Sequence, residues 1–154
     1  MAAAAKKIKN KVKSKSSDIE IEDGYAPNDG EEFMNPKQLE FFHRQLNDWR
    51  NEVVAESRGT LNSLQDGPIR EPDMNDRASS ETDWGIELRT RDRQRKLIAK
   101  IDSAIRRIDE GEYGYCQVTG EPISLARLCA RPIATMTLEA QEGHERQERI
   151  SRDD

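Results

Sequence analysis

The residues best suited to metal chemistry lie between Gly114 and Ile123, in a segment with the outline of a zinc knuckle. Cys116 stands at the first position of a CxxC-like pair, but Thr119 stands at the second. The same frame recurs further along the chain, with Thr137 and Ala140 where a second pair would stand. A structural zinc site needs four nitrogen or sulfur donors at the corners of a tetrahedron. One cysteine in these positions therefore predicts that zinc is absent and that no cofactor is tightly bound.

Two other residues, Cys129 and His144, could take part in metal or redox chemistry. Cys129 and His144 could recruit a metal in a different geometry, although a thiol packed in a small core is the simpler explanation for Cys129. The two cysteines leave open either ordinary reduced thiols, as is typical of a cytoplasmic protein, or a redox pair of Cys116 and Cys129. His43 and His144 lie in polar helical patterns with no neighbouring nucleophile, so we expect no catalytic residue and no enzyme activity.

The composition favours extended helices over a thick globular core. Of the 154 residues, 34% are hydrophobic, 5% are aromatic and 36% are charged, a balance that leaves many helical faces exposed. The net charge of -5 opposes the phosphate neutralisation that DNA binding requires, so we expect no direct sequence-specific DNA binding. No apolar run is long enough for a membrane span. We therefore expect a cytoplasmic protein without membrane contacts.

Residues 1–32 lack apolar periodicity, and we expect them to form a disordered N-terminal tail. Residues 1–17 are rich in alanine and lysine, whereas residues 18–32 are acidic and contain glycine and proline. The lysine run could contact nucleic acid, but a solvated tail is the more common outcome for such runs.

The first long helix is expected to begin at Asn35 and Pro36. Asparagine is a favoured N-cap residue, proline suits the first helical position, and Gln38 stands where a capping-box partner belongs. Apolar residues then follow at alternating steps of three and four, which is the pattern of a coiled-coil stripe. They are Leu39, Phe42, Leu46, Trp49 and Val53. Gly67 and Pro68 predict the end of this helix.

A second long helix is expected to start between Asp73 and Asp76 and to stop at Gly111. Its predicted apolar stripe consists of Trp84, Leu88, Ile98, Ile101, Ile105 and Ile108. Two long helices joined by a short link pack antiparallel. The sequence thus predicts a mainly α fold, with a coiled-coil hairpin over residues 33–110 whose tip lies near residues 66–78.

Residues 111–154 are expected to form a small zinc-finger-like module that lacks its metal. A short polar C-terminal helix, from about Leu138 to Arg149, is expected to close the chain. The apolar residues that could supply a core for this module are Ile123, Leu125, Leu128, Ile133, Met136 and Leu138.

Five blocks of sequence indicate a family. They are Phe33-Met-Asn, Trp49-Arg-Asn, Glu87-Leu-Arg-Thr-Arg-Asp-Arg-Gln-Arg-Lys-Leu-Ile, Gly111-Glu-Tyr-Gly-Tyr-Cys and Leu128-Cys-Ala-Arg-Pro132. Together they resemble the DksA/TraR family of bacterial transcription regulators, over nearly everything from Glu31 to Glu148. The full hairpin makes the chain similar to the DksA branch, since short TraR-like members lack much of the first arm. With one cysteine at the four ligand positions, the chain resembles the subgroup of the family whose zinc finger is degenerate.

The resemblance implies a monomeric factor that binds bacterial RNA polymerase and inserts its coiled coil into the secondary channel of the enzyme. Such a factor would modulate initiation at ribosomal RNA and amino-acid promoters in the stringent response. Asp73, Asp76 and Ala78 match the family's tip pattern, in which carboxylates face the polymerase active site. Helix capping explains Asp73 and Asp76 equally well, and the two roles are compatible.

The resemblance also implies an effector site for guanosine tetraphosphate (ppGpp), built jointly with a polymerase subunit. The matching positions are Arg93, Leu97, Lys100 and Arg131. Arg93 and Lys100 share one helix face, and cationic side chains are what a polyphosphate requires. The last basic position of the family's pattern is Gln141 here. This departure bears on the affinity of the site and not on its existence.

Two other functions stay open on the sequence alone. Paired acids at a coiled-coil tip permit a Gre-like transcript-cleavage factor, in which such acids assist the metal of the polymerase. The rest of the chain does not resemble that family. A degenerate zinc finger could also bind nucleic acid by itself, but the acidic net charge opposes this.

Overall fold

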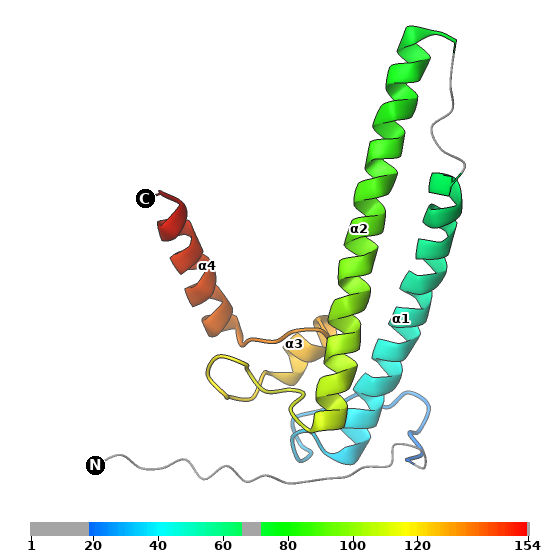
Figure 1. Ribbon diagram of the computed structural model, residues 1–154. Helices are drawn as coiled ribbons and strands as arrows, with labels where there is room; N and C mark the ends of the chain where they lie inside the picture. The colour runs from blue at the N-terminus through cyan, green and yellow to red at the C-terminus, as the bar shows by residue number, and fades with distance from the viewer. Residues whose placement is uncertain (1–18, 66–71, 154) are drawn as a thin grey trace. The chain divides into compact units, whose positions relative to one another are not determined.

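The computed structural model describes residues 19–65 and 72–153, which contain four helices and no β-strand. The helices are α1 (Pro36–Gln65), α2 (Met74–Glu110), α3 (Leu125–Ala130) and α4 (Leu138–Asp153), drawn in Figure 1. The chain divides into two compact units. The hairpin unit is His43–Ile105, and the knuckle unit comprises the residues up to Phe42 and from Arg106 onward. The prediction of a mainly α fold is confirmed.

The start of α1 is fixed by side chains on both sides of it. The Asn35 side-chain oxygen accepts the backbone N–H of Gln38 at 2.9 Å, and the Gln38 side-chain oxygen accepts the N–H of Met34 at 2.9 Å. Pro36 is the first helical residue, where its missing N–H costs nothing. The predicted helix start is confirmed, with the returning bond one residue earlier than in a standard capping box.

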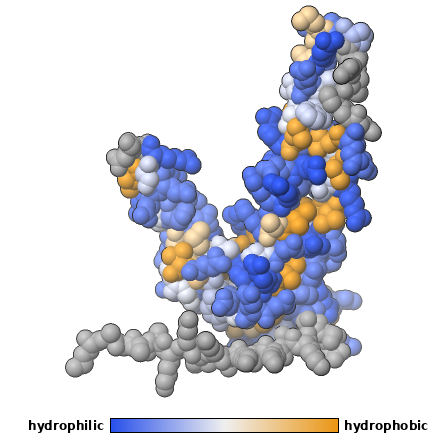
Figure 2. All heavy atoms as spheres, viewed as in Figure 1, coloured by the Kyte–Doolittle hydropathy of each residue, from blue (hydrophilic) through white to orange (hydrophobic). Residues whose placement is uncertain are grey.

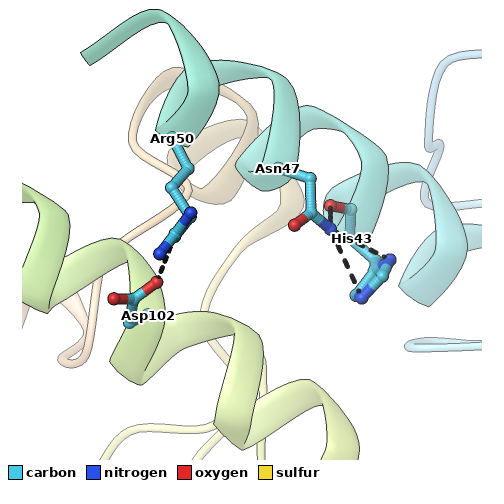
Figure 3. A network of polar contacts seen from close by, with 4 residues as sticks. All are labelled: His43, Asn47, Arg50 and Asp102. Atoms are coloured by element: carbon cyan, nitrogen blue, oxygen red, sulfur yellow. Dashed lines mark hydrogen bonds and ion pairs between the residues drawn. The ribbon is translucent and has the colours of Figure 1, made fainter. Parts of the chain in front are cut away.

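In the hairpin unit, α1 and α2 run antiparallel and side by side (Figure 1). Leu46 and Val53 of α1 and Ile101 and Ala104 of α2 are buried, as expected of a coiled-coil seam. The Arg50 Nε donates to Asp102 Oδ1 at 2.6 Å and so joins the two helices (Figure 3). Both side chains are substantially exposed, so this pair contributes at most about 1 kcal/mol.

Figure 3 also shows a contact within one helix. The Asn47 side-chain amide donates to the backbone carbonyl of His43 at 2.9 Å and lies near the His43 ring. His43 is therefore tied into α1 one turn away from Asn47. This contact gives His43 a local structural role within α1.

The predicted stripe on α2 is wrong in its first half. Trp84 is 36% exposed and Leu88 is 41% exposed, and Met74 and Ile86 are exposed as well. Figure 2 shows apolar patches open to solvent along the hairpin. The later turns of α1 contain Ser57, Gly59 and Thr60, which offer little apolar surface to pack against. The positions of Gly67 and Pro68, and part of the predicted tip, lie outside the described residues.

In the knuckle unit, α2 ends at a glycine. Gly111 has φ 75°, a conformation that glycine adopts without strain. Its N–H donates to the Ile108 carbonyl at 3.1 Å, and the Glu112 N–H donates to the Arg107 carbonyl at 2.9 Å. This pair of bonds is a Schellman motif, which satisfies the last carbonyls of a helix. The predicted stop at Gly111 is confirmed.

The core of the knuckle unit is small and aromatic. Phe42, Tyr113, Ile123, Leu125 and Leu128 are buried, which confirms the last three as predicted core residues. The Tyr113 hydroxyl donates to the Pro132 carbonyl at 2.7 Å, so its buried oxygen is satisfied.

The C-terminal helix departs from the prediction in two ways. Leu138 was expected in the core but is exposed, because it is the first residue of α4 and does not reach the packed residues of the knuckle. The helix also continues to Asp153, beyond the expected end near Arg149. Charged side chains on all sides of α4 let it extend into solvent without burying apolar surface.

The segment before α1 differs from the expected disordered tail. The Tyr25 hydroxyl donates to the Glu31 carboxylate at 2.5 Å, and the Tyr25 ring meets Phe41 edge-on with centroids 6.0 Å apart. Glu31 also accepts from Asn35 and Gln38, so a local polar network orders this part of the chain. Hydrogen bonding of the Glu31 carboxylate to Tyr25 lowers its pKa below the ordinary value. Residues 1–18 lie outside the described residues.

Candidate functional site

The zinc-knuckle outline folds as a tight loop. Tyr115 and Pro122 form an isolated antiparallel bridge, and the Ile123 N–H donates to the Gly114 carbonyl at 2.7 Å. Inside this bridge, the Cys116 N–H donates to the Glu121 carbonyl at 2.7 Å. Backbone hydrogen bonds therefore link the two ends of the loop.

The sulfur of Cys116 lies where the loop meets the start of α4. Cys116 is 3% exposed, and burial alone would raise the pKa of its thiol. Hydrogen bonds from the Thr119 side chain and from the backbone of Thr119, Thr137 and Val118 outweigh burial and lower this pKa to about 6. Donors aimed at a sulfur favour its ionised form. The structure thus brings together three of the four predicted zinc positions, with Cys116 as their common acceptor.

The fourth position, Ala140, lies in the first turn of α4. Its N–H donates to the Thr137 hydroxyl at 3.4 Å, and the Gln141 N–H donates to the Thr137 carbonyl at 3.0 Å. Thr137 is therefore the N-cap of α4, a role for which threonine is well suited. The Thr119 hydroxyl likewise accepts the Glu121 N–H at 3.3 Å, so the two threonines at predicted ligand positions stabilise a turn and a helix start.

These residues do not fit a zinc ion. Ala140 has no side-chain donor, and one thiolate cannot complete a tetrahedron with two neutral hydroxyls. No group of three or more histidine, cysteine or acidic side chains in the described part of the chain could hold a metal. Cys129 is a free, exposed thiol whose pKa is raised by desolvation. His144 lies 3.8 Å from Glu148 on α4, one helical turn away.

The predicted tip residues lie at the start of α2. The Asp73 carbonyl accepts the N–H of Arg77 at 2.9 Å, which makes Asp73 the N-cap residue. Asp76 lies in the first turn, where a carboxylate interacts favourably with the helix dipole. Asp73, Asp76 and Ala78 are all exposed. A capping position and an exposed carboxylate are thus both present, and neither role excludes the other.

The four predicted ppGpp-binding residues fall in the two units. Arg93, Leu97 and Lys100 lie on α2 in the hairpin unit, whereas Arg131 is the C-cap residue of α3 in the knuckle unit. Arg93, Lys100 and Arg131 are exposed, and Leu97 is half-buried.

Arg95 and Lys96, which lie between Arg93 and Lys100 in the sequence, form ion pairs with Asp92. Asp92 binds Arg95 at 2.8 Å and Lys96 at 2.7 Å. Hydrogen bonding to Lys96 lowers the pKa of Asp92 below its ordinary value. Arg93 and Lys100 have no ion pair with another described residue. Their charges are therefore available to an external anion, unlike those of Arg95 and Lys96.

One polar cluster was missed by reasoning from the sequence. The Arg127 Nε donates to the Met136 carbonyl at 3.0 Å, and its Nη2 donates to the side-chain oxygen of Gln141. The Gln141 amide nitrogen in turn donates to Glu145 at 2.9 Å. The available signal was the spacing of Arg127 and Arg131, two cations four residues apart, of which the first lies in α3 and the second is its C-cap residue. Arg131 and Pro132 mark a bend in the sequence, but no sequence pattern shows that Arg127 and Gln141 meet across it.

The fold and the knuckle define a class of proteins: a helical hairpin joined to a zinc-finger-like module. Residues 38–108 match the family described as DnaK suppressor protein DksA, N-terminal domain. Residues 111–146 match the prokaryotic dksA/traR C4-type zinc finger.

Relatives agree with both matches. The "RNA polymerase-binding transcription factor DksA" of Caulobacter vibrioides is 60% identical over 130 residues, covering 84% of this chain and 92% of the relative. The protein of the same name from Escherichia coli K12 is 41% identical, covering 75% of this chain and 76% of the relative. The structure of transcription factor DksA2 from Pseudomonas aeruginosa aligns with a TM-score of 0.69 and 43% identity, covering 76% of this chain and 90% of that one. The chain therefore belongs to the DksA/TraR family.

The helices contain no candidate for a membrane span. None of those in the described part of the chain combines the necessary length with sufficient apolar character.

Proposed function

We propose that this chain binds bacterial RNA polymerase and regulates transcription initiation. The observation that carries the proposal is the 60% identity, over 84% of the chain, to a relative named as an RNA polymerase-binding transcription factor. We further propose that the hairpin enters the secondary channel of the polymerase, and that the protein acts as a cytoplasmic monomer. The support for channel entry is length: the two hairpin helices have 30 and 37 residues, which corresponds to roughly 45–55 Å at 1.5 Å per residue.

The exposed start of α2 supports a partner at the tip. Apolar side chains that stay in water cost free energy unless a partner covers them, and Met74, Trp84 and Ile86 are all exposed. Asp73 and Asp76 lie in this same part of the helix. We propose that the apolar residues contribute binding, and that the two carboxylates act near the polymerase active site.

We propose that ppGpp is the effector and that Arg93, Leu97, Lys100 and Arg131 contribute to its binding at the polymerase interface. The unpaired charges of Arg93 and Lys100 support this assignment. Lys100→Ala should then remove the effect of the nucleotide while leaving the nucleotide-independent effect largely intact. Lys96→Ala is the matched control, because Lys96 is already paired with Asp92 at 2.7 Å. An equal nucleotide response in both variants and the parent would contradict the assignment.

We also propose that the knuckle folds without zinc. The support is the donor set: one thiolate, two threonines and one alanine at the four positions, with the Cys116 sulfur held by hydrogen bonds. A domain that depends on metal loses its folding free energy when the metal is chelated. The melting curve should therefore be unchanged by EDTA, and elemental analysis should find far less than one zinc per chain. Stoichiometric zinc would refute this.

The decisive experiment for the main proposal is a reconstituted transcription assay with purified RNA polymerase. Initiation at a ribosomal RNA promoter is measured with and without the protein, and with and without ppGpp. We expect the protein to change initiation and ppGpp to enhance that change. No effect on initiation and no binding to polymerase would overturn the proposal.

A second candidate function is favoured by the exposed acid pair Asp73 and Asp76. A Gre-like factor would use such carboxylates to help the polymerase metal hydrolyse RNA. A cleavage assay with backtracked polymerase distinguishes the two functions. Shortened transcripts in the presence of the protein would support the cleavage factor, and we expect none.

A further inference from the structure

We infer that Arg127 is an additional phosphate-binding residue of the proposed ppGpp site, and that Gln141 positions its guanidinium. This inference rests on the proposed function and names a cation that the family resemblance does not assign. It gives a physical reason for the polar Gln141 at a position where the family's pattern has a basic residue.

The surroundings of Arg127 hold the side chain without neutralising it. Its two described hydrogen bonds go to neutral oxygens, the Met136 carbonyl at 3.0 Å and the Gln141 amide oxygen. No carboxylate of the described residues forms an ion pair with it. A guanidinium stays charged at all physiological pH values. A fixed and unneutralised guanidinium is well prepared to bind a phosphate, because little side-chain entropy is left to lose.

Arg127 lies in α3, and the predicted ligand Arg131 is the C-cap residue of the same helix. The Arg131 N–H donates to the Arg127 carbonyl at 2.8 Å, so the two residues lie one turn apart. Arg131 directly follows the last residue of α3, so both cations belong to the same short stretch of the knuckle unit. Together they present two cations in the knuckle unit, which suits the paired phosphates of a pyrophosphate group.

Gln141 connects Arg127 to the first turns of α4. Its amide oxygen accepts from Arg127, and its amide nitrogen donates to Glu145 at 2.9 Å. A lysine at position 141 would place a like charge against the guanidinium. A basic side chain at position 141 could not accept a hydrogen bond from Arg127, whereas the Gln141 amide oxygen does.

A pair of variants gives opposite expectations for a binding role and a structural role. Exchanging the two α4 side chains in the double variant Gln141→Glu and Glu145→Gln keeps the composition and the net charge. It preserves an acceptor for Arg127, but that acceptor is now a carboxylate, which neutralises the guanidinium. A merely structural contact would be kept or strengthened, whereas phosphate binding should weaken.

The measurement is the binding of ppGpp to the complex of the full chain with RNA polymerase, beyond its binding to polymerase alone. We expect Arg127→Ala and the exchange variant each to weaken that binding by about 10-fold or more, the usual effect of losing a charge-assisted hydrogen bond. Arg146→Ala is the control, because Arg146 is an exposed cation of α4 with no described ion pair. It should bind ppGpp like the parent. Melting temperatures and polymerase affinity are measured for every variant, and we expect the exchange variant to match the parent in both.

The outcomes separate this inference from the proposed site itself. If Lys100→Ala and Arg131→Ala weaken ppGpp binding while the exchange variant binds like the parent, the ppGpp site stands and Arg127 is only a structural anchor. If none of these variants changes the binding, the proposed site is wrong and the inference falls with it. If Arg127→Ala does not fold, the exchange variant still decides the question.

Discussion

The knuckle and the first half of α2 use their side chains in opposite ways. In the knuckle, Leu128 is fully buried and the buried oxygen of Tyr113 has a hydrogen-bond partner. In the first half of α2, Trp84 and Leu88 stay exposed. The difference indicates that folding free energy is concentrated in the knuckle and near the buried end of the coiled-coil seam. Residues in the exposed half of α2 can then be substituted with little effect on the free energy of unfolding, which leaves them available for contacts with a partner.

The largest expected effect on the free energy of unfolding appears when one leucine in each region is replaced by alanine. Leu128→Ala removes a fully buried side chain and should lower the free energy of unfolding by about 2–5 kcal/mol, because it leaves a cavity. Leu88→Ala removes an exposed side chain and should cost well under about 1 kcal/mol. Chemical denaturation of both variants measures the two costs. Equal costs would show that Leu88 is packed after all and would break the comparison.

A second prediction concerns two glycines of the knuckle loop, Gly114 and Gly120. Both have positive φ, 89° and 75°, so alanine is strained at either position. A Cβ at Gly114 would also lie 2.9 Å from the Met34 side chain, whereas one at Gly120 meets nothing within 4 Å. Gly120→Ala should therefore cost about 1 kcal/mol and Gly114→Ala about 2–3 kcal/mol, by the usual strain of this backbone conformation and of an overpacked contact.

Thermal melts of the two alanine variants test this difference directly. Shortening the neighbour in the double variant Gly114→Ala and Met34→Ala should recover part of the loss, because the clash is with a side chain. A Gly114→Ala variant that is no less stable than Gly120→Ala would mean that the Met34 contact adds nothing.

A third prediction follows from the pKa of Cys116, which the structure lowers from about 9 to about 6. The folded state then binds its proton less tightly than the unfolded state, so the ionised thiol stabilises the fold. This stabilisation is complete above about pH 9 and is lost as the pH falls through about 6. Cys116→Ser keeps a hydrogen-bond acceptor but cannot ionise in this range. The melting temperature of the parent relative to that variant should rise by a few degrees, roughly the effect of 1 kcal/mol, between these two pH values.

The pH series has a clear negative outcome. If the difference between the parent and Cys116→Ser is constant over the range, folding does not lower the pKa of the thiol. The hydrogen bonds at Cys116 would then act on a neutral sulfur, and the knuckle would gain nothing from its charge.

The sequence predicted those features that depend on neighbouring residues. Asn35 and Pro36 begin α1, and Gly111 ends α2, because caps and stops are set by a few adjacent residues. The periodic stripe on α2 was only half right. Periodicity marks Trp84 and Leu88 as one face of a helix but does not show whether a partner helix covers that face.

In the candidate site too, features set by local sequence could be predicted and contacts between distant residues could not. The four knuckle positions could be read from their spacing, and three of them meet at the Cys116 sulfur. The contact between Arg127 and Gln141 joins residues fourteen apart across a bend, so no local pattern indicates it. The same is true of Tyr25 and Phe41, whose contact gives structure to a segment that composition alone marks as a tail.

The smallest effect on stability, and the largest on regulation, is expected at the tip of α2. Asp76→Asn removes a carboxylate from the first turn, where its interaction with the helix dipole is worth at most about 1 kcal/mol. Asp83→Asn is the matched control, because Asp83 is exposed on the same helix beyond the first turn. We expect both variants to bind RNA polymerase and only Asp76→Asn to lose its effect on initiation, because a tip carboxylate acts after the hairpin has docked. Competition binding and the reconstituted transcription assay separate these steps. If Asp76→Asn loses polymerase binding and regulation to the same extent, Asp76 belongs to the docking surface. A carboxylate that acts only after docking would then have to be sought elsewhere on α2.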